Sequence, residues 1–160
     1  MHHQVKLLAI LMLVQGSMEA LYGLMFVALG PLMLTMIAID PGTASQPPPP
    51  AWVAAIYPAL GLPTLIGGSL KLWAGVLNLR FRGRTLGIAA LFTGLLAIPS
   101  CALYCIPTAL ALLVFGLVVY FDADATRAFV LGQDRLPADE ILDRVDRERE
   151  ARLRAGYPQR

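Results

Sequence analysis

Two ionisable residues, Glu19 and Lys71, each lie inside a long apolar stretch of the sequence. An ionisable group at membrane depth is costly, so by default it marks a functional path or an internal pair. Measured along helices, Glu19 lies roughly 20 Å from Lys6 and Lys71 roughly 13 Å from Arg80. The difference between these two distances is within the reach of a lysine side chain. We therefore predict a salt bridge between Glu19 and Lys71.

The spacing of the neighbouring residues supports this pairing. In each of the first two apolar stretches, residues spaced three or four positions apart form a stripe along one helix face. The first stripe is Met12, Gln15, Glu19, Tyr22 and Phe26, and the second is Thr64, Gly68, Lys71, Gly75 and Asn78. If the two helices run antiparallel, the bulky Tyr22 and Phe26 face the smaller Gly68 and Thr64. Gln15 then faces Gly75 and Asn78. Small residues and bonded polar groups are how helices associate in lipid. We expect Gln15, Tyr22, Thr64 and Asn78 to form a polar seam that supports the pair.

Three interpretations of the Glu19–Lys71 pair stay open at this point. It is a structural clasp, or Lys71 is unpaired and extends to the inner surface, or Glu19 belongs to a proton or ion path. A conduction path usually needs several polar groups in series. The later apolar segments offer only Thr85, Thr93 and Thr108.

The composition shows which elements must position these residues. Of the 160 residues, 57% are hydrophobic and 15% charged, and the mean hydropathy is +0.63, whereas soluble domains are about one quarter charged. Eight of the 13 Lys+Arg and nine of the 11 Asp+Glu follow Phe121. A net charge of +2 with interleaved signs gives no nucleic-acid footprint. We predict an apolar membrane domain, 1–121, and a polar tail, 122–160.

The apolar stretches predict an all-α membrane protein, a four-transmembrane-helix bundle with a short cytoplasmic helical tail. The spans are placed at about 5–29, 64–79, 85–98 and 106–121, with an outer Pro-rich loop at 40–50. Gly30-Pro31 is expected to kink the first apolar run, and Pro58 and Pro63 to separate an interfacial helix from the second span. The N-terminal stretch imitates a signal peptide, but its apolar run continues to Ile39, so we expect it to stay uncleaved.

The orientation follows from the positive charges, because cytoplasmic loops near a membrane hold Lys and Arg. Arg80, Arg82 and Arg84 form a tight basic turn, which we place in the cytoplasm. The segments 40–50 and 99–107 have neither Lys nor Arg and are placed outside. Four spans then leave both termini in the cytoplasm.

Cys101 and Cys105 lie in the segment placed outside, where an oxidising compartment would link them. Their C-x-x-x-C spacing differs from the C-x-x-C of redox-active pairs. A structural disulfide or two buried free thiols are favoured over a catalytic pair like that of four-helix quinone-linked disulfide-forming enzymes. His2 and His3 at a terminus make a weak metal site. We therefore expect no metal site, no cofactor and no enzymatic activity.

The tail is expected to form two helices. Asp122 is placed to cap a helix over 123–131 that Gly132 ends, and Pro137 opens the second. Four acid-before-base pairs at i,i+4 stabilise the second helix: Glu140–Arg144, Asp143–Arg147, Glu148–Arg152 and Glu150–Arg154. Its small apolar patch, Ile141, Leu142 and Val145, belongs either to a solvated helix or to a docking site for a partner.

Residues 70 to 129 contain LKLWAGVLNLRFRGRTLGIAAL, CALYCIPTALALLVFGLVVYF and DADATRAF. This stretch resembles small, uncharacterised four-span bacterial proteins that pair a similar basic turn with a last span and an "RAF" segment. The resemblance implies a bacterial inner-membrane protein and brings no activity. We expect a non-enzymatic scaffold or accessory subunit that contacts lipid and either a protein partner or further copies of itself. The alternative is a small proton- or ion-linked transporter or channel that uses Glu19.

Overall fold

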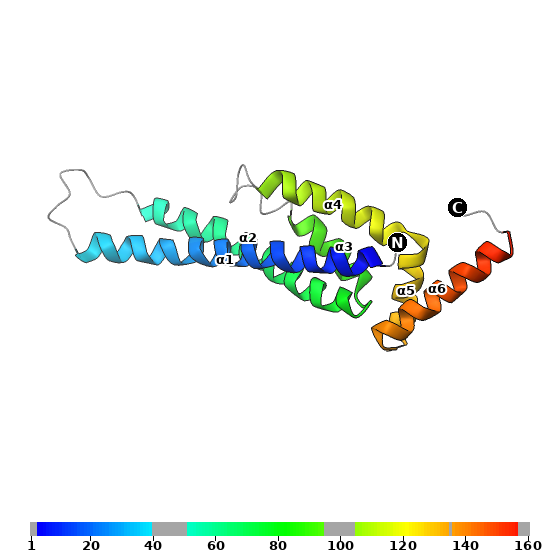
Figure 1. Cartoon of the computed structure of the whole chain (residues 1–160). Coiled ribbons are helices and arrows are strands. Elements are labelled where there is room, and N and C mark those ends of the chain that lie inside the picture. Colours follow the sequence, from blue (N-terminus) through cyan, green and yellow to red (C-terminus); the bar gives the residue numbers. More distant parts are fainter. Residues whose placement is uncertain (1–2, 40–50, 95–104, 135, 157–160) are drawn as a thin grey trace.

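The computed structural model describes residues 3–39, 51–94, 105–134 and 136–156. These residues form six helices: α1 (His3–Ile39), α2 (Ala51–Leu79), α3 (Arg84–Thr93), α4 (Cys105–Phe121), α5 (Ala123–Gln133) and α6 (Ala138–Arg154). Helices α1 and α2 run side by side as a long hairpin (Figure 1). Helices α3 and α4 pack along one end of that hairpin, and α5 and α6 close the same end.

Two helices are long and apolar enough to cross a membrane, over Gln4–Met36 and Ala54–Leu79. A third span results if α4 and α5, which are bent by 73° at Asp122, count as one. For the described residues, the prediction of an all-helical protein with helices able to cross a membrane is confirmed. The four-span arrangement stays a prediction. Residues 95–98 of the expected third span and the loop at 40–50 lie outside the described residues.

The prediction that Pro58 and Pro63 separate an interfacial helix from the second span was wrong, because α2 is one continuous helix. Helix α1 continues through Gly30 and Pro31, and α2 continues through Pro58 and Pro63. Prolines are tolerated in membrane helices when a neighbouring helix compensates for the lost backbone contacts. Here a side chain added at Gly30 would lie 2.8 Å from the Cδ of Pro58. The missing side chain of Gly30 therefore makes room for the proline ring, and the two helices stay packed.

Glycines at seven-residue intervals hold α1 and α2 together. Each helix carries three of them, Gly16, Gly23 and Gly30 on α1 and Gly61, Gly68 and Gly75 on α2. A Cβ on Gly23 would lie 2.5 Å from the backbone nitrogen of Leu65, and one on Gly68 equally close to that of Ala20. A seven-residue repeat keeps one face of each helix turned toward its partner. The backbones can therefore approach closely along most of the hairpin.

The turn between α2 and α3 is anchored in the core of the molecule. Phe81 adopts a positive φ of 53° and is fully buried, with its ring edge-on to Phe129 at 6.3 Å between centroids. Gly132, which we expected to end the fifth helix, is instead buried within it against the Phe81 carbonyl. The helix ends at Gln133, and the missing side chain of Gly132 lets α5 pack directly against the turn.

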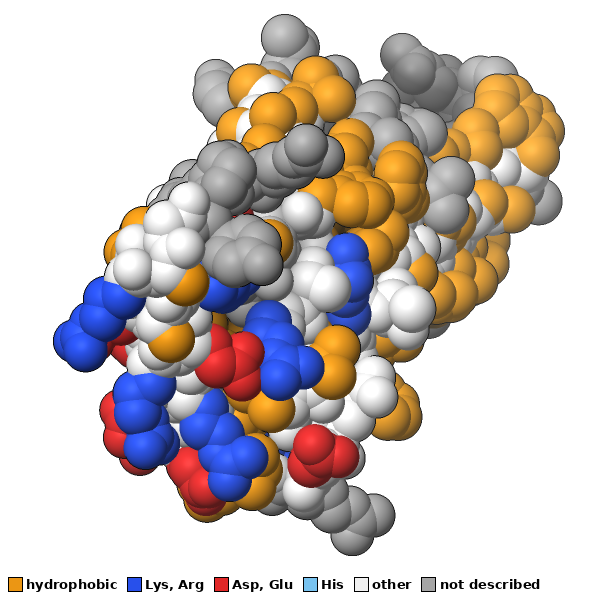
Figure 2. Space-filling model, turned by 90° about the vertical axis from the view of Figure 1, so that its right-hand side faces the viewer, with side chains coloured by type: hydrophobic (Ala, Val, Ile, Leu, Met, Phe, Trp, Pro, Cys, Tyr) orange, Lys and Arg blue, Asp and Glu red, His pale blue; other side chains and the backbone are white. Residues whose placement is uncertain are grey.

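The hydrophobic core continues from the membrane helices into the tail. Asp122 caps α5 as predicted, because its carboxylate accepts from the backbone N–H groups of Asp124 and Ala125 at 3.0 and 3.1 Å. The α6 patch of Ile141, Leu142 and Val145 is buried within the same core cluster as Phe129. The prediction of a partner docking site at this patch was therefore wrong, because other residues of the same chain cover the patch. Figure 2 shows the charged side chains gathered at this end of the molecule, with apolar surface behind them.

Candidate functional site

The buried ion pair between Glu19 and Lys71 is the centre of the candidate site. The Lys71 Nζ lies 2.5 Å from the Glu19 Oε1, and the two side chains are 1% and 2% exposed. Gln15 lies one turn before Glu19 and donates its amide N–H to the same oxygen at 2.9 Å. The structure thus brings three of the predicted residues together. The interpretation of Lys71 as an unpaired residue was wrong, because the carboxylate of Glu19 on α1 binds it.

Helix α3 supplies the third side of this site. A Cβ placed on Gly94, just after the last residue of α3, would lie 2.5 Å from the Lys71 Nζ. The lysine ammonium therefore packs directly against the C-terminal end of α3. The carboxyl end of a helix carries partial negative charge, which favours a cation there. Lys71 is thus stabilised both by Glu19 and by the end of a helix, an arrangement that residue spacing alone did not predict.

One carboxylate oxygen in the site has no hydrogen-bond partner among the described residues. The Oε2 of Glu19 is buried, while Oε1 accepts from both Lys71 and Gln15. A buried acceptor without a partner is costly.

A second polar cluster lies two turns from the ion pair, toward the basic turn. Asn78 Nδ2 donates to the Tyr120 hydroxyl and to the Met12 Sδ, the latter at 3.6 Å, and the Tyr120 hydroxyl lies 3.7 Å from that sulfur. Tyr120 was missed from sequence, although it is the one tyrosine of the fourth apolar segment. Asn78 contacts Met12 and Tyr120 rather than Gln15, so that part of the predicted seam was wrong.

The remaining residues of the predicted seam do not make the contacts that the stripes predicted. Thr64 is fully buried, and its hydroxyl donates to the Leu60 carbonyl of its own helix at 3.0 Å. Tyr22 is 42% exposed and lies off the seam. Gly68 packs against Gly16 and Ala20 instead of Tyr22. The glycine repeat sets this register, and its seven-residue spacing was the signal that the stripes overlooked.

The basic turn is partly used to hold the chain together. Arg82 Nε donates to the Gly132 carbonyl in the last turn of α5 at 3.3 Å, a favourable place for a cation. The guanidinium of Arg84 lies 5.8 Å from the ring centroid of Phe121. Arg80 is exposed. Arg82 therefore connects this turn to α5, and Arg84 connects it to the end of α4.

The expected disulfide lies outside what the structure describes. Cys101 is not among the described residues, and Cys105 is described only as the first backbone position of α4. In the described part of the chain, no three His, Cys, Asp or Glu side chains gather to hold a metal ion.

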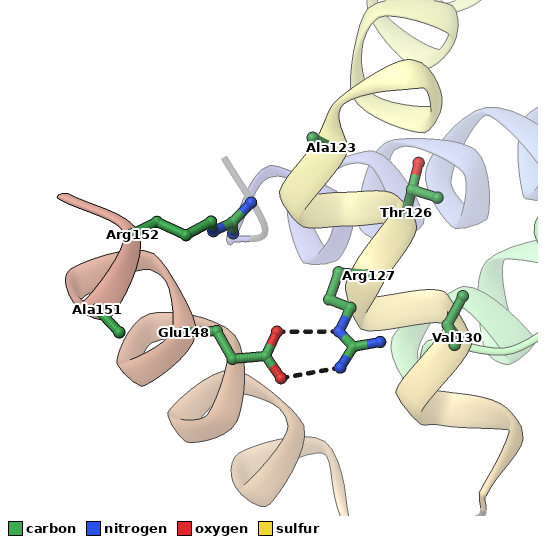
Figure 3. Close-up of a pocket in the computed structure, with 7 residues that line it drawn as sticks. All are labelled: Ala123, Thr126, Arg127, Val130, Glu148, Ala151 and Arg152. Atoms are coloured by element: carbon green, nitrogen blue, oxygen red, sulfur yellow. Dashed lines mark hydrogen bonds and ion pairs between the residues drawn. The ribbon is translucent and has the colours of Figure 1, made fainter. Parts of the chain in front are cut away.

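An open groove of 510 Å³ lies between α5 and α6 (Figure 3). Arg127 donates two hydrogen bonds to Glu148 at its centre, at 2.9 and 3.0 Å, and Arg152 binds Asp124 at 2.8 Å. The hydrogen bonds from Arg127 hold the pKa of the Glu148 carboxyl below its ordinary value. This groove is remote from Glu19, so it offers no entry to the buried pair.

Of the four ion pairs predicted within α6, two form as expected. Glu140–Arg144 has a separation of 2.8 Å and Glu150–Arg154 one of 3.5 Å. Glu148 and Arg152 instead bind α5, and the Arg147 guanidinium donates to the backbone carbonyl of Asp143 at 3.2 Å. The prediction treated α6 as a solvated helix, whereas α5 provides partners of opposite charge.

No protein-family model, no curated protein and no solved structure matches this chain. The described residues form a long hairpin with a buried ion pair between its helices and a docked charged tail at one end.

Proposed function

We propose that this protein is a non-enzymatic accessory or scaffold subunit of a bacterial inner-membrane complex, with four spans and both termini in the cytoplasm. The observation that carries this proposal is the far end of the α1–α2 hairpin, which extends beyond α3 and α4 (Figure 1). The resemblance of the segment 70–129 to small bacterial membrane proteins supports the location. The Arg80–Arg84 turn supports the orientation.

The hairpin is longer than a membrane requires. The 37 residues of α1 extend about 55 Å at 1.5 Å per residue, against a hydrocarbon core of about 30 Å. Helix α4, with 17 residues, reaches about 25 Å by the same rise and must stand nearly upright to cross that core. Because α4 runs roughly along α1 (Figure 1), α1 cannot absorb its excess length by tilting. One end of the hairpin then projects past the bilayer.

The projecting end exposes large apolar side chains. Trp52 is 63% exposed and Ile56 42% at the start of α2, and Met36 is 66% exposed near the end of α1. Apolar surface in water is unfavourable by roughly 25 cal/mol per Å². Large exposed apolar surfaces mark contacts with other proteins or with a membrane, and this end projects past the bilayer. A partner subunit that covers this end explains why a 17 kDa protein would keep such a long apolar hairpin.

Site-specific photo-crosslinking in native membranes tests this role. A photoreactive amino acid at Ile56 should yield one discrete product with a second protein species, which mass spectrometry identifies. The control position is Val114, which is 61% exposed on α4 and should yield lipid adducts only. The proposal is overturned if Ile56 gives the same lipid adducts as Val114.

Proton-linked transport is a second candidate, favoured by the unpartnered Oε2 of Glu19. A carboxylate that exchanges its proton needs an oxygen free of other partners, and this atom provides one. In sealed vesicles that contain the purified protein, a pH-sensitive dye would report proton flux, and Glu19→Gln would abolish it while the protein stays folded. Flux that is absent from the unmodified protein would exclude this candidate.

A further inference from the structure

The chain leaves α2 through a left-handed helix end in which a phenylalanine holds the critical position. The Phe81 N–H donates to the Asn78 carbonyl at 3.0 Å, and the Arg82 N–H donates to the Leu77 carbonyl at 2.9 Å. These two hydrogen bonds are typical of a helix end in which one residue, usually glycine, adopts a left-handed conformation. Phe81 occupies that position, with a φ of 53°. The conformation is strained for a bulky residue, because the Cβ crowds the backbone.

Elsewhere the same chain uses glycine where the backbone is left-handed. Gly83 precedes α3 with a φ of 76°, and Gly156 follows α6 with a φ of 70°. Within the described ranges, Phe81 is the only residue other than glycine with a positive φ. The side chain of Phe81 therefore contributes a contact that glycine could not make.

Helix α5 provides the contacts that hold Phe81 in this conformation. The Phe81 side chain is fully buried, and its ring lies edge-on to Phe129 at 6.3 Å between centroids. Arg82 donates to the Gly132 carbonyl at 3.3 Å. A side chain on Gly132 would collide with the Phe81 carbonyl. Helix α5 thus contacts the turn through a ring, a hydrogen bond and its own backbone.

The turn is also connected to the polar cluster between α2 and α4. Asn78, whose carbonyl accepts the Phe81 N–H, donates from its side chain to the Tyr120 hydroxyl. The Tyr120 ring lies 5.7 Å from the Phe129 ring, so α5 contacts both the turn and α4. We propose that α5 is a latch on this end of the bundle. When α5 is docked it holds Phe81 in the strained conformation, and when it is displaced the turn relaxes and Asn78 separates from Tyr120.

The strain at Phe81 distinguishes a latch from a fixed joint. A strained backbone persists only while the surrounding structure holds it, and such positions cluster at switch regions. Helix α6 is attached to α5 through exposed ion pairs, Arg127–Glu148 at 2.9 Å and Arg152–Asp124 at 2.8 Å. Exposed pairs are screened by salt, so α6 is the part of the latch that the solution can act on. The inference does not depend on the accessory role, which concerns the projecting end of the hairpin.

Hydrogen exchange of the turn amides tests the latch. Gly132→Ala adds a methyl group that forces α5 away from the Phe81 carbonyl. The amides of Phe81 and Arg82 should then exchange several-fold faster, after correction for intrinsic rates. Gly67→Ala is the control, because a Cβ there would lie at an ordinary 3.4 Å from the Thr93 carbonyl oxygen. The full chain is measured in lipid vesicles by mass spectrometry, and the control should leave both amides unchanged.

The decisive variant combines Phe81→Gly with Gly132→Ala. Glycine adopts the left-handed conformation without strain, so the turn no longer needs α5 and the protection of the Arg82 amide should return. If the ring contact alone stabilises the turn, Phe81→Gly will instead accelerate exchange further, which overturns the latch. Unchanged exchange in Gly132→Ala also overturns it. Arg82→Gln is a milder displacement that removes only the hydrogen bond to the Gly132 carbonyl, and it should give the same acceleration and the same rescue on a smaller scale.

Discussion

At the scale of single residues, the Glu19–Lys71 pair depends on what surrounds it as much as on its own attraction. Two buried charges are costly to desolvate, and their attraction compensates only when the geometry is good. Gln15 shares the carboxylate, and the C-terminal end of α3 lies beside the ammonium. Removing one partner should therefore destabilise the bundle far more than removing both.

We expect Glu19→Gln alone, or Lys71→Met alone, to lower the free energy of unfolding by about 3 kcal/mol, because each leaves an uncompensated buried group. The double variant should recover most of that loss. Unfolding in mixed detergent micelles, followed by circular dichroism, gives the four values of the cycle. Losses that simply add in the double variant would show that the two residues are not coupled in the membrane.

The pairing of Glu19 with Lys71 was predictable because two opposite charges in apolar runs have few ways to be satisfied. The contact of Asn78 with Tyr120 was not, because it depends on how α4 crosses the hairpin, and the sequence does not specify that angle. Gly94 beside Lys71 is a similar case. The sequence around a glycine near the end of an apolar segment does not indicate which side chain will pack against it.

At the scale of the elements, close backbone packing holds α1 against α2. Gly67 and Gly68 are neighbours that differ in this respect. A Cβ at Gly68 would meet the Ala20 backbone nitrogen at 2.5 Å, whereas one at Gly67 would meet the Thr93 carbonyl oxygen at an ordinary 3.4 Å. The two positions therefore form a matched pair for substitution.

Gly68→Ala should lower the free energy of unfolding by about 1–3 kcal/mol, because two backbones must separate to admit the methyl group. Gly67→Ala should leave it unchanged or raise it slightly, since alanine favours the helix. Thermal unfolding of both variants in one detergent measures the difference. Equal effects at the two positions would show that the seam is looser than a direct glycine contact.

The attachment of α6 to α5 should weaken in acid. The Arg127 hydrogen bonds lower the pKa of Glu148 below its ordinary value. A lowered carboxyl pKa contributes stability above the unfolded-state pKa of about 4.3, and this is lost as pH falls through the folded-state pKa. The contribution is small because both side chains are over 40% exposed.

Hydrogen exchange of α6 between pH 7 and 3, corrected for intrinsic rates, should show lower protection at the acidic end. Glu148→Gln should reduce protection already at pH 7 and remove most of this pH dependence. Glu150→Gln is the matched control, because Glu150 binds Arg154 within α6 and does not connect the two helices. If the control alters the exchange as much as Glu148→Gln does, the interhelical pair is not responsible.

The element boundaries show where sequence patterns succeed and fail. The start of α5 was predictable because the Asp122 cap is a local signal that neighbouring residues satisfy. The courses of α1 through Pro31 and of α2 through Pro58 were not, because packing between helices overrides the local preference of proline. The burial of the α6 patch likewise depends on α5. The spacing of apolar residues within α6 does not predict which helix packs against it.

At the scale of the whole molecule, the distribution of arginines predicts the orientation. Single cysteines at Arg80 and Arg154 should be protected from an impermeant maleimide in intact cells and become labelled after the membrane is opened. A cysteine at Ser45, in the segment placed outside, should be labelled in both conditions. Each single cysteine is introduced into a Cys101→Ala, Cys105→Ala background. Labelling of Arg80→Cys in intact cells would reverse the proposed topology.

The distance between the two charged partners along the chain has a consequence for biosynthesis. Glu19 precedes Lys71 by 52 residues, so at 5–20 residues per second the carboxylate waits roughly 3–10 s for its partner to be made. During that time α1 carries an intramembrane acid that disfavours release into lipid by about 3 kcal/mol. The two long helices are then best integrated as a pair, with α1 held beside the insertion machinery until α2 arrives.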